Sequence, residues 1–222
     1  MISRENLAFI SATSAGVILL FTIGLSRPDL LAEDGLVENL GAAGFAAAAL
    51  LALSTALRKS AFLIITERHM LVGTSGLSLM LFLSEISFGA RIFDIQMPQM
   101  RGGGEFDGGH DIIIVFFRRL SDAGRTSLLV VAAAIGLLLV TVIALLFLFR
   151  QQAQAIVRSV FYGAFEFRLA VALGMLASAV ILDLITSYKA GILEEVLEFS
   201  ASAVLILAVT ALLRQKNVLR VV

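Results

Sequence analysis

The feature that most constrains this chain is a series of six apolar segments, each long enough to cross a lipid bilayer. About 20 apolar residues at a rise of about 1.5 Å each span a hydrocarbon core of about 30 Å. The segments are approximately Leu7–Leu25, Val37–Leu57, Met70–Gly89, Leu128–Phe149, Leu169–Thr186 and Val196–Leu213. The sequence therefore predicts an all-α fold, a polytopic transmembrane helical bundle with about six membrane-spanning helices.

The composition agrees with a membrane protein and excludes several other classes. Of the 222 residues, 59% are hydrophobic and 15% are charged, whereas a soluble domain carries about 25% charged residues. Lys and Arg together number 17, as do Asp and Glu, so no net charge favours nucleic acid as a partner. The chain has no cysteine, which excludes disulfides and thiolate metal sites.

The chain is expected to form one integral membrane domain over residues 1–222, because no internal repeat or low-complexity linker divides it. A long outer loop is expected at about 90–126. The first apolar run has no clear cleavage site and is predicted to stay as the first helix. The second run is rich in alanine and glycine, which suits close helix packing in lipid. Residues 150–168 predict a short helix lying on the inner face.

The orientation of the bundle follows from the basic residues between its helices. With a cytoplasmic N-terminus, the inner segments hold ten of the 17 Lys and Arg residues. Basic residues favour the cytoplasmic side. The sequence therefore predicts that both the N-terminus and the C-terminus lie inside, and the localisation that we expect is a bacterial inner membrane.

This topology brings most acids near the apolar segments to one depth, at the outer face. A charge within an apolar span costs roughly 2.5–3.5 kcal/mol at mid-helix and less near an end, so something must offset that cost. Arg91 and His110 reach the same face through the 90–126 loop. The candidate polar site consists of Glu38, Glu85, Arg91, Glu105, His110, Asp183, Glu194, Glu195 and Glu198.

Three of these acids lie close along one helix. Glu194 and Glu198 are four residues apart and Glu195 and Glu198 are three apart, so their side chains share a helix face and repel. A cation, shared protons or a basic partner would relieve that repulsion.

Carboxylates and an imidazole together are ligands for a divalent metal ion, and the predicted set is Glu85, His110, Glu194 and Glu198. An oxygen-rich set favours Ca²⁺, Mg²⁺ or Mn²⁺, and a histidine favours Zn²⁺ or Fe²⁺.

Simpler explanations of the same residues stay open. Acids at helix N-termini complement the helix dipole, which would account for Glu38, Glu194 and Glu195. Glu85 pairs with Arg91 if its helix ends near Gly89. His110 is then a solvated histidine at the membrane surface.

The residues SEISFGARIF (84–93) and GEFDGGHD (104–111) resemble a pattern of uncharacterised bacterial polytopic membrane proteins, with a helix end close to EEISWGQRIF and a loop that ends in a Gly-Glu…His-Asn element. EDGLVE (33–38) and EEVLE (194–198) also resemble parts of it. This chain differs in having Ser84 where a second glutamate is usual, Phe88 for tryptophan and Asp111 for asparagine. The resemblance implies a fold and a site, and it names no activity.

Two functions remain open from the sequence. In the first, the outward-facing Glu/Asp/His/Arg cluster binds a cation or a polar lipid headgroup, with hydrolysis of a lipid-linked substrate as an extension. In the second, the protein is a non-enzymatic subunit or scaffold whose charges register helices and dock a membrane-protein partner or a second copy. Whether the protein is an enzyme is left undecided.

Overall fold

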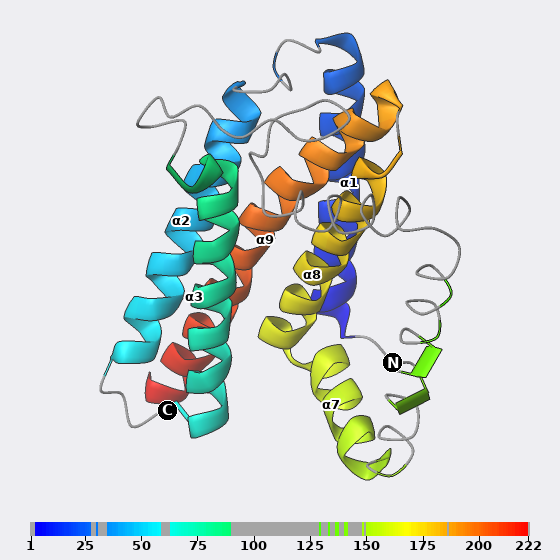
Figure 1. Cartoon of the computed structure of the whole chain (residues 1–222). Coiled ribbons are helices and arrows are strands. Elements are labelled where there is room, and N and C mark those ends of the chain that lie inside the picture. The colour runs from blue at the N-terminus through cyan, green and yellow to red at the C-terminus, as the bar shows by residue number, and fades with distance from the viewer. Residues whose placement is uncertain are drawn as a thin grey trace.

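A computed structural model describes residues 3–27, 30, 35–58, 63–89, 150–185 and 187–221, together with single positions between 129 and 148. Within these ranges all regular structure is helical. The helices are α1 (Arg4–Ser26), α2 (Leu36–Leu57), α3 (Ile65–Glu85), the short 3₁₀ turn η2 (Ser87–Gly89), α7 (Arg150–Tyr162), α8 (Ala164–Asp183) and α9 (Tyr188–Val221). The first and last helices run in opposite directions along the bundle (Figure 1).

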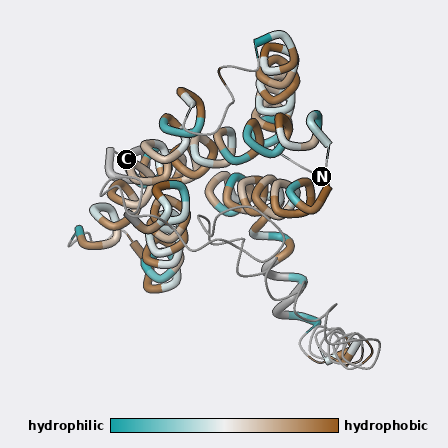
Figure 2. Tube along the Cα trace, turned by 45° about the horizontal axis from the view of Figure 1, so that its top comes forward, coloured by the Kyte–Doolittle hydropathy of each residue, from teal (hydrophilic) through white to brown (hydrophobic). Residues whose placement is uncertain are grey.

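Four of these helices are long and apolar enough to cross a membrane: α1, α2, α8 and α9. This confirms the predicted membrane helical bundle at the level of an all-helical protein with several spans. The predicted span Leu128–Phe149 lies largely outside the described residues. Hydrophobic residues recur along the helices in Figure 2, and many of them are exposed, including Ile18 at 64% and Leu50 at 69%. Lipid is the solvent that suits such a surface.

Helix α3 differs from the predicted span Met70–Gly89. It starts five residues earlier and ends at Glu85. It is not among the helices apolar enough to qualify as a span, because its first turn holds Glu67 and Arg68 and its middle carries small polar residues. Those residues face inward: Thr74, Ser75 and Ser78 are buried, and the Ser75 hydroxyl donates to the Ala49 carbonyl of α2 at 2.9 Å.

Helix α9 lies at the centre of the bundle and packs against both α8 and α2, while α2 lies between α9 and α3 (Figure 1). The close contact between α2 and α9 is possible because the second predicted segment, which forms α2, is rich in small residues. A Cβ added at Gly44 of α2 would collide with the Ser202 hydroxyl of α9, and Ala48 and Ala52 are fully buried. Small residues let two helix backbones approach closely, which is how helices associate in lipid.

The bundle has two chemically different ends. At one end lie the starts of α1, α3 and α8 and the end of α9. Glu5 of α1 pairs with Arg168 of α8 at 2.9 Å, and Glu67 of α3 pairs with Lys216 of α9 at 2.8 Å. We call this the basic end. The described basic side chains there are Arg4, Arg58, Arg68, Arg150, Arg158, Arg168, Arg214 and Lys216.

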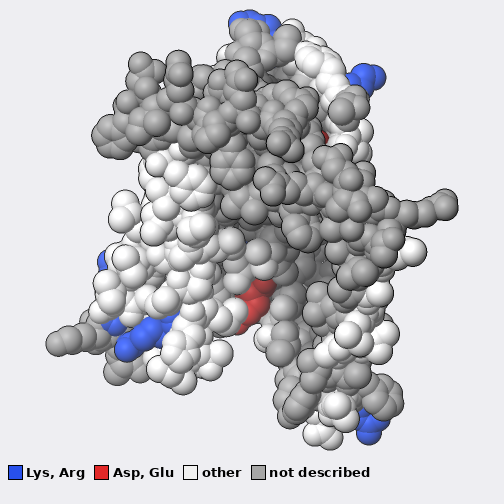
Figure 3. Space-filling view, viewed as in Figure 1, with Lys and Arg blue, Asp and Glu red and all other residues white. Residues whose placement is uncertain are grey.

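At the opposite end, which we call the acidic end, lie the end of α1, the start of α2, the end of α3, the end of α8 and the start of α9 (Figure 1). Its described acids are Glu38, Glu85, Asp183, Glu194, Glu195 and Glu198, and its described basic residues are Arg27 and Lys189. In Figure 3 the Lys and Arg side chains lie toward the top and the bottom of the molecule, and a patch of Asp or Glu is visible between them in the lower half.

The predicted surface helix in residues 150–168 is present in shorter form as α7, which ends at Tyr162. Gly163 separates it from α8, and α7 contacts the start of α8 at the basic end. Apolar side chains of α7 are exposed, with Val157 at 53% and Phe161 at 43%. This arrangement is typical of a helix that lies along a membrane surface.

Candidate functional site

The acidic end contains a close group of four carboxylates on the α8–α9 pair, which we call the α8–α9 acid group. Asp183 is the last residue of α8, and Glu194, Glu195 and Glu198 lie on α9. All four side chains are half-buried. Asp183, Glu198 and Glu195 each repel Glu194 electrostatically, with Asp183 the strongest. The structure therefore brings these four predicted residues together.

Glu194 lies in an electrostatically unfavourable position within this group. Burial and three neighbouring carboxylates both oppose its negative charge. Within the described ranges it has no hydrogen bond and no ion pair. Partly buried like charges interact more strongly than exposed ones, because water screens them less. A cationic group placed among these carboxylates would relieve the repulsion.

The helix dipole does not account for the glutamates of α9. The sequence favoured a helix start near Val196, which would have put Glu194 and Glu195 at the N-terminus. Helix α9 instead begins at Tyr188 and has no acid in its first turn. The dipole effect falls off within one turn, so the glutamates lie too far along the helix to benefit. Glu38 is different, since it does lie in the first turn of α2.

Glu85 occupies a separate setting at the end of α3. The helix ends at this residue, four residues before the predicted Gly89, and the chain enters η2. Ser87 and Phe88 have φ values of 49° and 53°, a left-handed conformation that costs about 1 kcal/mol or more for such residues. The Ser87 hydroxyl is buried without a hydrogen-bond partner. The predicted pairing of Glu85 with Arg91 lies outside the described residues.

The predicted single pocket is therefore only partly assembled by the described residues. Glu38 and Glu85 lie at the acidic end, but on α2 and α3. In Figure 1 the end of α3 and the end of α8 lie on opposite sides of the bundle. Neither Glu38 nor Glu85 is among the groups that repel Glu194. Arg91, Glu105 and His110 lie outside the described residues, and their approach to this end stays a prediction.

Among the described residues, no three His, Asp or Glu side chains form a group that could hold a metal ion. Glu85, Glu194 and Glu198 thus do not make a chelating set by themselves, and the predicted set with His110 stays a prediction. The α8–α9 acid group offers only carboxylate oxygens, which suit hard cations and ammonium groups.

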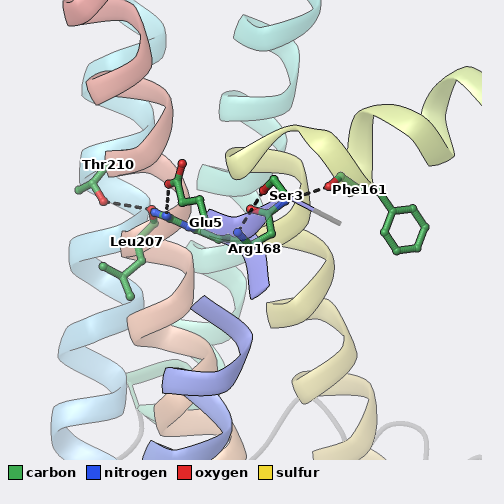
Figure 4. A network of polar contacts seen from close by, with 7 residues as sticks. Ser3, Glu5, Phe161, Arg168, Leu207 and Thr210 are labelled. Atoms are coloured by element: carbon green, nitrogen blue, oxygen red, sulfur yellow. Dashed lines mark hydrogen bonds and ion pairs between the residues drawn. The ribbon is translucent and has the colours of Figure 1, made fainter. Parts of the chain in front are cut away.

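A second polar network, which the sequence analysis did not predict, lies at the basic end (Figure 4). Arg168 Nη1 donates to the Leu207 carbonyl at 2.9 Å, Nη2 pairs with Glu5, and the guanidinium lies 5.0 Å from the Phe9 ring centre. Asn6 is fully buried and donates to the Phe161 carbonyl at 3.0 Å. This network joins α1, α7, α8 and α9. The only signal for it was a pair of opposite charges, Glu5 and Arg168, at the predicted inner helix ends.

Comparisons of the chain with protein-family models, with curated proteins and with solved structures found no match.

Proposed function

We propose that this protein is an integral membrane protein whose α8–α9 acid group binds a cation at the outer boundary of the bilayer. The observation that carries the proposal is Glu194, a half-buried carboxylate repelled by three others and without a described partner. A cation or a cationic headgroup supplies the attraction that the described neighbours lack. Because the described carboxylates make no chelating set, the cation in this proposal is exchangeable.

The proposal includes the finer topology: six spans, with the segment near 128–149 as one of them, and both termini in the cytoplasm. Its support is the distribution of basic residues, since eight described ones lie at the basic end and two at the acidic end. Basic residues favour the cytoplasmic side. A bacterial inner membrane and kinship with the polytopic family that residues 84–93 and 104–111 resemble are parts of the same proposal.

The length of α9 is consistent with an acid group at the membrane boundary. Its 34 residues correspond to about 51 Å of helix, and the hydrocarbon core is about 30 Å thick. The helix therefore extends beyond the core. Glu194 lies in its second turn, before the apolar stretch that follows Glu198, so its carboxylate is within reach of water and dissolved ions.

The topology is tested by labelling single cysteines, for which a chain without native cysteine is well suited. Tyr188→Cys marks the acidic end and Gln215→Cys marks the basic end; both side chains are exposed. With a membrane-impermeant maleimide on intact cells, we expect labelling at position 188, and at position 215 only after lysis. The reverse pattern would overturn the N-in, C-in arrangement.

Cation binding is tested on the detergent-purified full chain by elemental analysis after equilibration with Ca²⁺, Mg²⁺ or Mn²⁺. We expect bound cation in the wild type, less in Glu194→Gln, and no loss in the control Glu38→Gln, which removes a carboxylate at the same end but outside the acid group. Glu85→Gln and His110→Ala test whether those residues join the site.

Equal cation content in all variants would contradict the proposal. It would favour the alternative, a non-enzymatic subunit or scaffold whose charges register helices. A membrane-protein partner or second copy that co-purifies and is lost with Glu194→Gln would support that alternative directly.

A further inference from the structure

At the basic end, Arg68 has no counter-charge among the residues that the structure describes. It lies in the first turn of α3, where the positive end of the helix dipole disfavours a cation. Its side chain is only partly exposed, and its Nε atom is buried without a hydrogen-bond partner. Within the described ranges Arg68 makes no ion pair. A guanidinium in this position is expensive unless an anion binds to it.

The nearest acid in sequence, Glu67, is already fully engaged. Its Oε1 atom pairs with Lys216 Nζ at 2.8 Å, and its Oε2 atom accepts from the Ile64 backbone N–H at 3.1 Å. Glu67 therefore neutralises Lys216 and caps α3, and it leaves the charge of Arg68 uncompensated.

A second basic residue lies at the same end of the α2–α3 pair. Arg58 follows the last residue of α2, and α2 packs along α3. The Arg58 side chain is exposed and, like Arg68, makes no described ion pair. Figure 3 shows Lys and Arg side chains gathered at the lower left, where the end of α2, the start of α3 and the C-terminal part of α9 lie in Figure 1. This corner of the bundle carries net positive charge.

Exposed apolar side chains border these two arginines. Leu57 is 70% exposed, Ile64 is 60% exposed and Ile65 is 66% exposed. Each is within one to four residues of Arg58 or Arg68 in the sequence. A soluble anion would make no use of such a border, whereas the acyl chains of a lipid would pack against it. Cationic and apolar groups side by side are the combination that an anionic phospholipid contacts.

We propose that Arg68 and Arg58 form a binding site for the phosphate of an anionic phospholipid, with its acyl chains against Leu57, Ile64 and Ile65. Arginine presents several N–H donors in a plane and suits bidentate contact with phosphate oxygens. The first turn of α3 adds the positive end of its dipole. The site lies at the opposite end of the bundle from the α8–α9 acid group, so either proposal stands if the other fails.

The test compares melting of the detergent-purified full chain with phosphatidylglycerol or phosphatidylcholine of identical acyl chains added to the micelles. We expect phosphatidylglycerol to raise the melting temperature by several degrees and phosphatidylcholine to have little effect. Arg68→Gln should weaken the apparent affinity for phosphatidylglycerol at least about fivefold, since each basic contact near a lipid surface contributes about that factor.

Two further variants keep the test decisive. Arg58→Gln changes an exposed residue that the fold does not need, so it should lower the lipid response even if Arg68→Gln folds poorly. Arg150→Gln removes one positive charge on α7 at the same end, away from the site, and should keep the full response.

Three results would overturn the proposal. The first is a full lipid response in both Arg58→Gln and Arg68→Gln. The second is an equal loss in Arg150→Gln, which would indicate a general charge effect. The third is an equal rise in melting temperature with inorganic phosphate, which would identify a site for a soluble anion.

Discussion

The two ends of the bundle handle ionised side chains in opposite ways. At the basic end, acids lie beside bases: Glu5 with Arg168 and Glu67 with Lys216. At the acidic end, the α8–α9 pair places Asp183 and three glutamates together, and the other three carboxylates repel Glu194. Opposite charges paired across helices hold the fold together without a ligand. Repulsion between like charges at a membrane boundary is relieved by a cation, a shared proton or a basic partner.

The two ion pairs of the basic end connect α1 to α8 and α3 to α9, and so help to fix how these helices align. The repulsion within the acid group does not contribute to that alignment. The largest core side chains that are fully buried, Phe45, Phe165 and Leu71, lie in the two core clusters along the bundle. Packing of apolar side chains therefore stabilises the bundle along its length. It does not explain why four carboxylates lie together in the acid group.

The largest loss of stability is expected for Arg168→Ala, which removes the polar contacts of this residue at the basic end. The change removes the bond to the Leu207 carbonyl, the pair with Glu5 and the contact with the Phe9 ring. We expect a destabilisation of about 2–3 kcal/mol, because charged hydrogen bonds of a partly buried group are lost together. Unfolding in a detergent titration measures it. A loss below about 0.5 kcal/mol would show that this network does not join the helices.

A smaller loss is expected for Glu67→Ala, at the second ion pair of the basic end. The side chains of Glu67 and Lys216 are only 16% and 20% exposed, and Glu67 also caps α3. Loss of the cap and the pair should cost about 1–2 kcal/mol. Glu67→Gln retains an oxygen for the cap and should recover part of the loss. If both variants match the wild type, the pair has no structural role.

At the acidic end we expect a substitution that increases the stability of the protein. In buffer of pH 9 without divalent cations, in which Glu194 is ionised, Glu194→Gln should stabilise the protein by about 1 kcal/mol, because it removes three repulsions and no described bond. The same melting experiment on Glu38→Gln provides the control and should show no such gain. A destabilised Glu194→Gln in cation-free buffer would indicate that Glu194 has an attractive partner.

The smallest effect is expected for Glu5→Gln. The Glu5 side chain is 67% exposed, and exposed ion pairs contribute about 0.5 kcal/mol or less. Arg168 keeps its bond to the Leu207 carbonyl in this variant. The change in melting temperature should be within experimental error, and a loss as large as that of Arg168→Ala would place most of the network's energy in this pair.

The sequence predicted the class of fold because lipid imposes a simple rule on length and hydropathy. Four predicted spans correspond to α1, α2, α8 and α9. The ends of the helices were predicted less accurately. Helix α9 begins at Tyr188, eight residues before the apolar run begins. A helix can continue through polar turns outside the hydrocarbon, where hydropathy does not mark its end. The early end of α3 could not be predicted, because the left-handed conformations of Ser87 and Phe88 occur in residues that rarely adopt them.

Part of the candidate site could also be predicted, because spacing in the sequence determines which side chains share a helix face. Spacing along one helix correctly grouped Glu194, Glu195 and Glu198, and the short turn after α8 brought Asp183 to them. Spacing cannot tell which neighbouring helices touch. Glu38 and Glu85 share a depth with the acid group, but α2 and α3 lie on another side of α9. The ion pairs of the basic end were missed because they join residues more than 140 positions apart in sequence.

The most direct test of the acid group as a cation site is a titration of CaCl₂ or MgCl₂ against the melting temperature, with NaCl at matched ionic strength. We predict that the wild type rises by several degrees, since a ligand that binds only the folded state stabilises it. In cation-free buffer of pH 9, where Glu194 is ionised, Glu194→Gln should start higher, and it should rise less than half as much. Parallel curves for the two proteins, or a divalent ion no better than NaCl, would contradict the cation site.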